Sequence, residues 1–238
     1  MIDSKPRCKA AIDIEKNRLI ITMAGHVDEK SITKLCVDVR SCVTELKQGF
    51  EVINDLSQCS FMHLAGLTIY KKMIDHIILN RAGEMIRIID DYNISSKQVK
   101  KISEKINCYK PIYAKNYKEA VENLESVFRR KSIRFSIHKI NFWYEFRKKI
   151  GKGILTDIST SGCAIESPTI NLSPRSKPLI TLNFDNHETL PSVFTLNSTV
   201  VRSGENMFAV KFTNLEDELK EQLYKRFIYE VTRSVYVP

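Results

Sequence analysis

The sequence lacks any apolar run long enough to cross a membrane. A spanning helix needs roughly 18 consecutive apolar residues, and no segment of the 238-residue chain supplies them. Residues 1–9 carry charges with no apolar stretch behind them, so we expect no signal peptide. Together these absences predict a soluble protein located in the cytoplasm.

The cysteines form no pattern typical of a metal or redox site. None belongs to a Cys-x-x-Cys pair, and no histidine stands at a zinc-ligand spacing from any of them. We therefore expect free thiols in a reducing compartment and no metal. The six cysteines are Cys8, Cys36, Cys42, Cys59, Cys108 and Cys163.

Motifs of the common catalytic sites are missing as well. The sequence has no nucleophile elbow, no P-loop and no Gly-rich dinucleotide turn. The adjacent carboxylates Asp90 and Asp91 could hold a hard cation, but they also fit the solvated end of a strand. The sequence predicts a protein that is not an enzyme and has no cofactor.

What the sequence does have is positive charge. The formal net charge is +9, and most of the excess lies from Phe128 onward. Such a surface attracts phosphate ligands, nucleic acids or acidic lipids. A basic nucleic-acid-binding protein is one alternative, although no arginine-rich recognition helix or row of aromatic side chains on a strand supports it.

The first half alternates strand and helix signals. Between residues 28 and 46, apolar side chains recur every three or four positions, which predicts an amphipathic helix. Strands separated by helices of this length favour a parallel or mixed sheet with helical cover. We expect strands at residues 10–14, 19–23, 50–56, 84–89 and 112–114, and helices at 28–46, 64–79, 95–106 and 116–124.

After Ser126 the pattern changes to short strands separated by turns rich in Gly, Ser and Pro, which predicts a small barrel or sandwich. A final amphipathic helix is expected at residues 216–232. We place the domain boundary within residues 126–130, giving domains at residues 1–127 and 128–238. The strands are expected at residues 133–137, 141–146, 154–157, 163–166, 179–184, 194–202 and 207–212.

Two short motifs of the second half suit recognition of a guanine nucleotide. Arg130 and Arg134 stand four positions apart, and a guanidinium group can bind two phosphate oxygens at once or stack on a base. Further along, Asp157-Ile158-Ser159-Thr160-Ser161-Gly162 supplies a carboxylate, a hydroxyl and a glycine. These groups can accept from a purine edge and allow close backbone approach. Each motif alone is weak evidence, because basic pairs and Asp-x-Ser turns are common.

Their joint occurrence resembles the PilZ family of bacterial cyclic di-GMP receptors. Both the R-x-x-x-R and the D-x-S-x-x-G signatures are intact, and the resemblance covers roughly residues 128–232. It implies a six-stranded β-barrel with a C-terminal helix and cyclic di-GMP as ligand. By position, Arg130 and Arg134 would contact phosphates and guanine faces, whereas Asp157, Ser159 and Gly162 would hold a guanine edge. In that family the position before the first motif influences how many ligand molecules bind, and the arginine there, Arg129, implies a pair rather than one.

The first half resembles a STAS domain, the fold of anti-sigma factor antagonists, over about residues 9–125. The local match is Asp55-Leu56-Ser57 followed by residues 61–67. Where that family has Asp-Ser-Ser, this sequence has His63, Leu64 and Ala65, so the phosphoacceptor hydroxyl is missing. We expect a protein-interaction module without the usual kinase switch, or a structural partner for the barrel.

The whole sequence therefore predicts a cyclic di-GMP receptor or effector. Because the arginine segment lies at the predicted domain junction, ligand capture there would be coupled to a protein-interaction surface on the STAS-like half. The protein partner is unknown. The alternatives are a PilZ/STAS scaffold that binds no nucleotide and the nucleic-acid-binding protein described above.

Overall fold

The computed structural model describes residues 5–105, 109, 111–126, 132–137 and 140–234. The chain divides into two compact units: residues 1–106 with 110–133, and residues 107–109 with 134–238. We refer to them as unit 1 and unit 2. The predicted boundary at residues 126–130 falls almost entirely on residues outside the described part of the chain. Among the described residues, no helix is both long and apolar enough to span a membrane.

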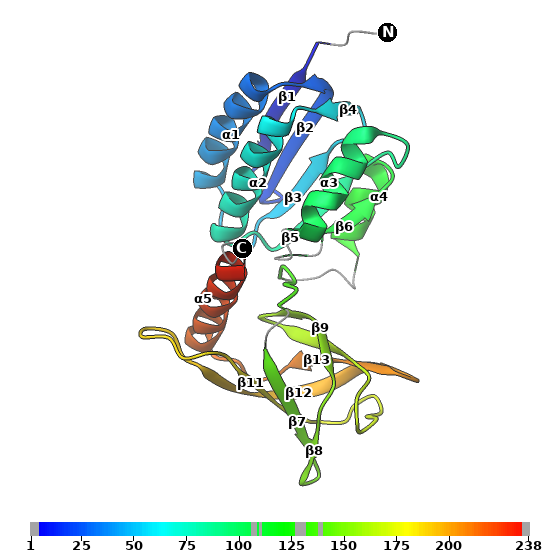
Figure 1. The fold of residues 1–238 in the computed structure, drawn as a ribbon, viewed down its shortest axis with the longest axis vertical. Coiled ribbons are helices and arrows are strands. Elements are labelled where there is room, and N and C mark those ends of the chain that lie inside the picture. The colour runs from blue at the N-terminus through cyan, green and yellow to red at the C-terminus, as the bar shows by residue number, and fades with distance from the viewer. Residues whose placement is uncertain (1–4, 106–108, 110, 127–131, 138–139, 235–238) are drawn as a thin grey trace. The chain divides into compact units, whose positions relative to one another are not determined.

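Unit 1 contains a mixed sheet in the order β1-β2-β3-β5-β6, with β4 paired to β2 (Figure 1). The first two strands form an antiparallel hairpin, and all other pairs are parallel. The order of strands and helices is the one predicted for a STAS-like domain, except that β4 was not expected. The strands are β1 (Arg7–Asp13), β2 (Arg18–Val27), β3 (Glu51–Asp55), β4 (Cys59–Met62), β5 (Glu84–Ile88) and β6 (Ile112–Ala114).

The helices of unit 1 follow the predicted amphipathic pattern. In α1, residues Ile32, Leu35, Val39 and Val43 are buried, and Asp28 caps the first turn by accepting from the backbone N–H of Ser31 at 2.7 Å. α1 and α2 pack against each other (Figure 1). The helices are α1 (Glu29–Thr44), α2 (Leu64–Leu79), α3 (Ile94–Lys105) and α4 (Tyr117–Glu125).

Unit 2 is not the closed six-stranded barrel that the sequence predicted. Its described residues form one open seven-stranded antiparallel path, β8-β7-β11-β12-β13-β10-β9, followed by α5 (Asp217–Ser234). The strands are β7 (Asn141–Phe146), β8 (Lys149–Gly151), β9 (Ile154–Ser159), β10 (Gly162–Glu166), β11 (Leu179–Asn183), β12 (Val193–Gly204) and β13 (Met207–Phe212).

The long strand β12 joins the two halves of the sheet and is irregular where they meet. Its first half pairs with β11 and its second half with β13, and the register shifts between Val200 and Arg202. Such an irregularity bends a strand and increases its twist. One end of the path is β8, which is three residues long. The other end is β9, which pairs with β10 and otherwise forms only a single bridge, between Ile158 and Phe135. The predicted strand at residues 133–137 is thus reduced to that bridge.

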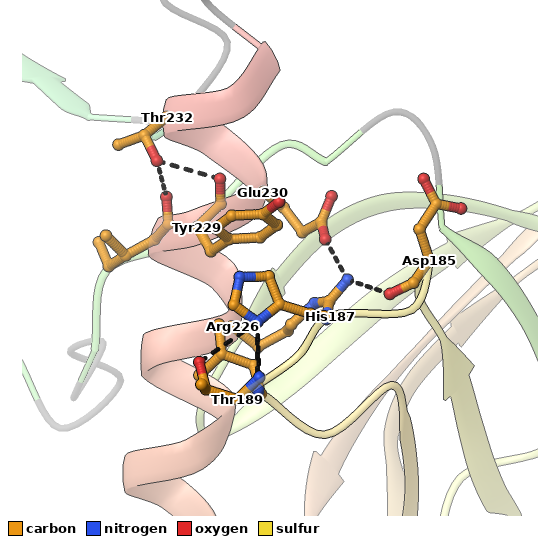
Figure 2. A network of polar contacts seen from close by, with 9 residues as sticks. Asp185, His187, Thr189, Arg226, Tyr229, Glu230 and Thr232 are labelled. Atoms are coloured by element: carbon orange, nitrogen blue, oxygen red, sulfur yellow. Dashed lines mark hydrogen bonds and ion pairs between the residues drawn. The ribbon is translucent and has the colours of Figure 1, made fainter.

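A buried arginine of α5 forms a hydrogen bond to the loop between β11 and β12 (Figure 2). Arg226 is fully buried, and its Nη2 donates to the Glu230 carboxylate at 2.5 Å and to the Asp185 carbonyl at 2.7 Å. Its guanidinium also lies over the rings of Phe184 and Tyr229. The sequence did not reveal this contact, because a charged residue on an amphipathic helix is expected on the solvent side.

Candidate functional site

Phe135 fixes the position of Arg134 in unit 2. Its backbone N–H donates to the Ile158 carbonyl at 2.7 Å, and its carbonyl accepts from the Ile158 N–H at 2.9 Å. The Phe135 ring is fully buried and lies 5.9 Å from the ring of Tyr224 and 5.7 Å from that of Phe227, both on α5. Because the backbone bridges β9 and the ring is anchored on α5, the preceding residue Arg134 is held beside β9.

Arg134 and Asp157, predicted from separate motifs, form an ion pair. Nη1 of Arg134 lies 3.0 Å from one carboxylate oxygen of Asp157 and 3.3 Å from the other. The Arg134 side chain is 31% exposed and that of Asp157 is 13% exposed. Since these contacts use one nitrogen of the guanidinium, the rest of its planar fork of donors remains for an anion.

The serine of the second motif has a structural role in the turn between β9 and β10. Ser159 is buried, and its hydroxyl donates to the Gly162 carbonyl at 3.2 Å and accepts from the Ser161 N–H at 3.2 Å. Its oxygen also lies 3.0 Å from the Ser161 hydroxyl. The Ser159 hydroxyl is therefore committed to the turn, whereas Ser161 is the exposed serine of the motif.

Gly162 is required by a close approach between strands. A Cβ atom at this position would lie 2.1 Å from the Val210 carbonyl oxygen on β13. The neighbouring backbone cannot move aside easily, because β10 and β13 are paired along their length at Gly162–Glu166. The glycine thus lets the turn that follows Asp157 sit against the sheet.

We expect Gly162→Ala to destabilise unit 2 by about 1–3 kcal/mol, the usual cost of overpacking. Chemical denaturation followed by the fluorescence of Trp143, the single tryptophan of the chain, measures this loss in unit 2. Gly204→Ala is a suitable control, since a Cβ there would meet only the flexible side chain of Met207 at 3.7 Å. Equal stabilities for the two variants would refute the close-packing explanation.

Cys163 is buried near the ion pair and was not predicted as part of the site. Burial raises the pKa of its thiol well above the ordinary range, the nearby Asp157 carboxylate raises that pKa further, and Arg134 lowers it. The thiol is thus protonated at neutral pH and acts as a small apolar packing group. No sequence signal distinguished it from the other scattered cysteines.

The structure therefore brings Arg134, Asp157, Ser159 and Gly162 together around one edge of the sheet. Arg129 and Arg130, the other two predicted site residues, lie outside the described residues. A separate hollow of about 450 Å³ in unit 2 contains none of the predicted residues. Its lining is Lys177, Pro178, Leu179, Asn197, Ser198, Thr199, Thr213 and Asn214.

Comparison with protein-family models identifies this region: the model of the PilZ domain matches residues 128–230. Residues 128–230 are a PilZ domain. The predicted signature residues lie inside the matched range, and Arg134 and Asp157 are in contact within it. No curated protein sequence matches the chain.

Three solved structures illustrate what the chain is similar to. The anti-sigma factor antagonist SpoIIAA in its unphosphorylated form has 12% identity and a TM-score of 0.39, covering 51% of this chain and 100% of that one. The PilZ domain of CeSA from a cellulose-synthesizing bacterium has 17% identity and a TM-score of 0.32, covering 42% and 97%. The inhibitor of motility MotI/DgrA of Bacillus subtilis has 12% identity and a TM-score of 0.36, covering 46% and 53%.

In unit 1, the polar residues near the STAS-like motif and the Asp90–Asp91 pair have structural partners. His63 is the N-cap of α2 and accepts from the Ala65 N–H. The Ser57 hydroxyl donates to Asp55 at 2.7 Å. Asp91 pairs with Lys100 at 2.6 Å, and Asp90 accepts from the Tyr92 N–H at 3.0 Å.

Proposed function

We propose that the PilZ domain is a receptor for cyclic di-GMP and binds it at the Arg134–Asp157 pair. The observation that carries this proposal is the pair itself: a partly exposed guanidinium held beside a carboxylate by a buried anchor residue. A ligand with two phosphates and two guanine bases needs both kinds of group. The arginine fork matches phosphate oxygens, and the carboxylate matches the N–H edge of guanine.

Asp157 can serve the arginine and the ligand together. An ionised carboxylate has two oxygens with about four lone-pair sites. The contacts to Arg134 use both oxygens but only one donor atom, which leaves lone pairs for a guanine N–H edge. The partial exposure of both side chains gives a ligand access. Their partial burial lowers the dielectric around the pair, which strengthens each charge-assisted hydrogen bond.

Arg129 and Arg130 complete the proposed site. They precede Arg134 by five and four positions in the sequence, and their guanidinium groups would supply the remaining phosphate and base contacts. With three arginines available, two stacked ligand molecules are favoured over one. Capture of the ligand by these arginines is the proposed means by which binding affects the rest of the protein.

Isothermal titration calorimetry of the full chain tests the proposal, with GMP as the nucleotide control. We expect saturable binding of cyclic di-GMP and far weaker binding of GMP, which has one guanine and one phosphate. A chain that binds neither nucleotide, or binds both equally, would contradict the assignment.

We also propose that ligand capture is coupled to a protein-interaction surface of unit 1. The support is the position of residues 129–134 in the sequence, where the chain passes from unit 1 to unit 2 between residues 133 and 134. A local charge event in such a segment changes how two domains are linked. Small-angle scattering is expected to show a changed radius of gyration at ligand saturation. Superimposable profiles with and without ligand would count against the coupling while leaving the binding site intact.

A further inference from the structure

The hairpin formed by β7 and β8 carries a cluster of basic side chains that the proposed function does not use. We define the basic hairpin by Arg147, Lys148, Lys149, Ile150 and Lys152. All four cations are exposed. None of them has a side-chain ion pair in the described part of the chain, and the only acidic residue between Asn141 and Lys152 is Glu145. Figure 1 shows this hairpin projecting from the sheet.

The turn holds two of these cations in a conformation that their side chains do not favour. Arg147 and Lys148 have φ angles of 50° and 61°. Tight hairpin turns with two left-handed residues are usually made by Asn-Gly or similar pairs, because a larger side chain is strained there. Apart from the Arg147 guanidinium, which lies 5.2 Å from the centre of the Phe146 ring, the contacts of the described residues give no local reason for a positively charged pair in this turn.

The base of the hairpin is rigid. The Tyr144 ring is fully buried, and its hydroxyl donates to the Ile170 carbonyl at 2.8 Å and accepts from the Ile170 N–H at 2.9 Å. Gly151 lies against that ring, since a Cβ there would come within 2.2 Å of it. Lys152 is bound to Thr169 through backbone and side-chain hydrogen bonds at 2.8 and 2.9 Å. The basic tip is thus presented on a fixed support.

An exposed aliphatic side chain accompanies the charges. Ile150 is 65% exposed and lies opposite Glu145 in the hairpin register. Ile154, which begins β9 just after the hairpin, is 60% exposed. Aliphatic groups gain nothing from a phosphodiester backbone, whereas they can enter the boundary between lipid headgroups and acyl chains. A hairpin tip that combines cations with isoleucine therefore fits an anionic bilayer better than a nucleic acid.

We propose that the basic hairpin is a docking surface for membranes rich in anionic phospholipids. The cations would lie at the headgroup phosphates, and Ile150 would enter the interface. This inference does not depend on cyclic di-GMP binding. A few cations and a single inserted aliphatic side chain give reversible membrane association and not stable anchoring.

The test is co-sedimentation of the full chain with vesicles of phosphatidylcholine mixed with phosphatidylglycerol, compared with phosphatidylcholine alone. The test variant is Arg147→Asn/Lys148→Asn. Asparagine tolerates left-handed φ angles, so the fold should be kept or slightly stabilised. Each basic residue at an anionic surface strengthens binding about fivefold, so we expect the partition coefficient to fall about 25-fold.

The control variant Lys30→Gln/Lys34→Gln removes the same charge from exposed positions of α1 in unit 1 and should change binding much less. Ile150→Ser should weaken binding several-fold at unchanged charge. Equal losses in the two double variants would overturn the proposal in favour of net charge alone. Absence of wild-type binding to the anionic vesicles would also overturn it, as would binding through the same hairpin to a DNA duplex but not to vesicles.

Discussion

Arg134→Ala is expected to abolish measurable binding of cyclic di-GMP while the PilZ domain stays folded. Removing one member of a charge-assisted clamp costs about 2–5 kcal/mol of binding free energy, at least a 30-fold loss of affinity. Asp157→Ala should have a comparable effect, because it removes both the guanine acceptor and the group that orients Arg134. Calorimetry of each variant against wild type measures the loss.

The fold should survive because the pair is partly exposed: Arg134 is 31% exposed. Ion pairs of this kind contribute at most about 1 kcal/mol to stability. Lys220→Ala is a matched control, since it removes another ion pair of the PilZ domain, Lys220–Asp217 at 2.7 Å. Arg134→Lys keeps the charge but loses the planar fork, and should bind weakly. Wild-type affinity in Arg134→Ala or Asp157→Ala would remove both residues from the site.

Phe135→Ala is expected to destabilise the PilZ domain by about 3–5 kcal/mol, the usual cost of truncating a fully buried phenylalanine. The ring joins β9 to α5 through Tyr224 and Phe227, so its loss leaves a cavity between them. The same change frees the segment that positions Arg134. Urea denaturation followed by Trp143 fluorescence reports this loss, because Trp143 lies on β7 within the domain.

Phe146→Ala provides the comparison for Phe135→Ala. Phe146 is only partly buried, at the end of β7, so its truncation should cost clearly less. Phe135→Leu should recover most of the stability, since it retains much of the buried volume. A loss below about 1 kcal/mol for Phe135→Ala would mean that the ring is not the anchor of the site. In that case folded Phe135→Ala protein would also bind cyclic di-GMP with wild-type affinity.

Much of the fold follows from the spacing of apolar residues along the sequence. The α/β order of unit 1 was predictable because each helix has a buried stripe and β5 is buried at every position. The strands β7 and β13 were predicted with the bounds they have. The short strands β4 and β8 were missed, since four and three residues are too few to show an alternation.

The open form of the second sheet could not be read from the sequence. Closure depends on whether the two edge strands meet, and β9 instead pairs with the backbone of Phe135. The buried Arg226 also escaped prediction, because the partners that compensate its charge, Glu230 and the Asp185 carbonyl, become neighbours only after folding.

The sequence motifs identified the residues of the candidate site, whereas their contacts became known only from the structure. The motifs named Arg134, Asp157, Ser159 and Gly162, and the structure places these four residues around one turn and one strand edge. The spacing of residues could not show that the Ser159 hydroxyl is used within the turn or that Cys163 is buried near the pair. The ligand roles of all six predicted residues stay predictions, and Arg129 and Arg130 lie outside the described residues.

The central claim is that cyclic di-GMP binds at the Arg134–Asp157 pair. The most direct test is a nitrogen-15 NMR titration of the full chain with cyclic di-GMP. We expect the largest shift changes at the Arg134 side-chain Nε–H and at the backbone amides of Ser161 and Gly162. Changes confined to the hollow around Lys177 and Asn197, or to unit 1, would contradict the claim.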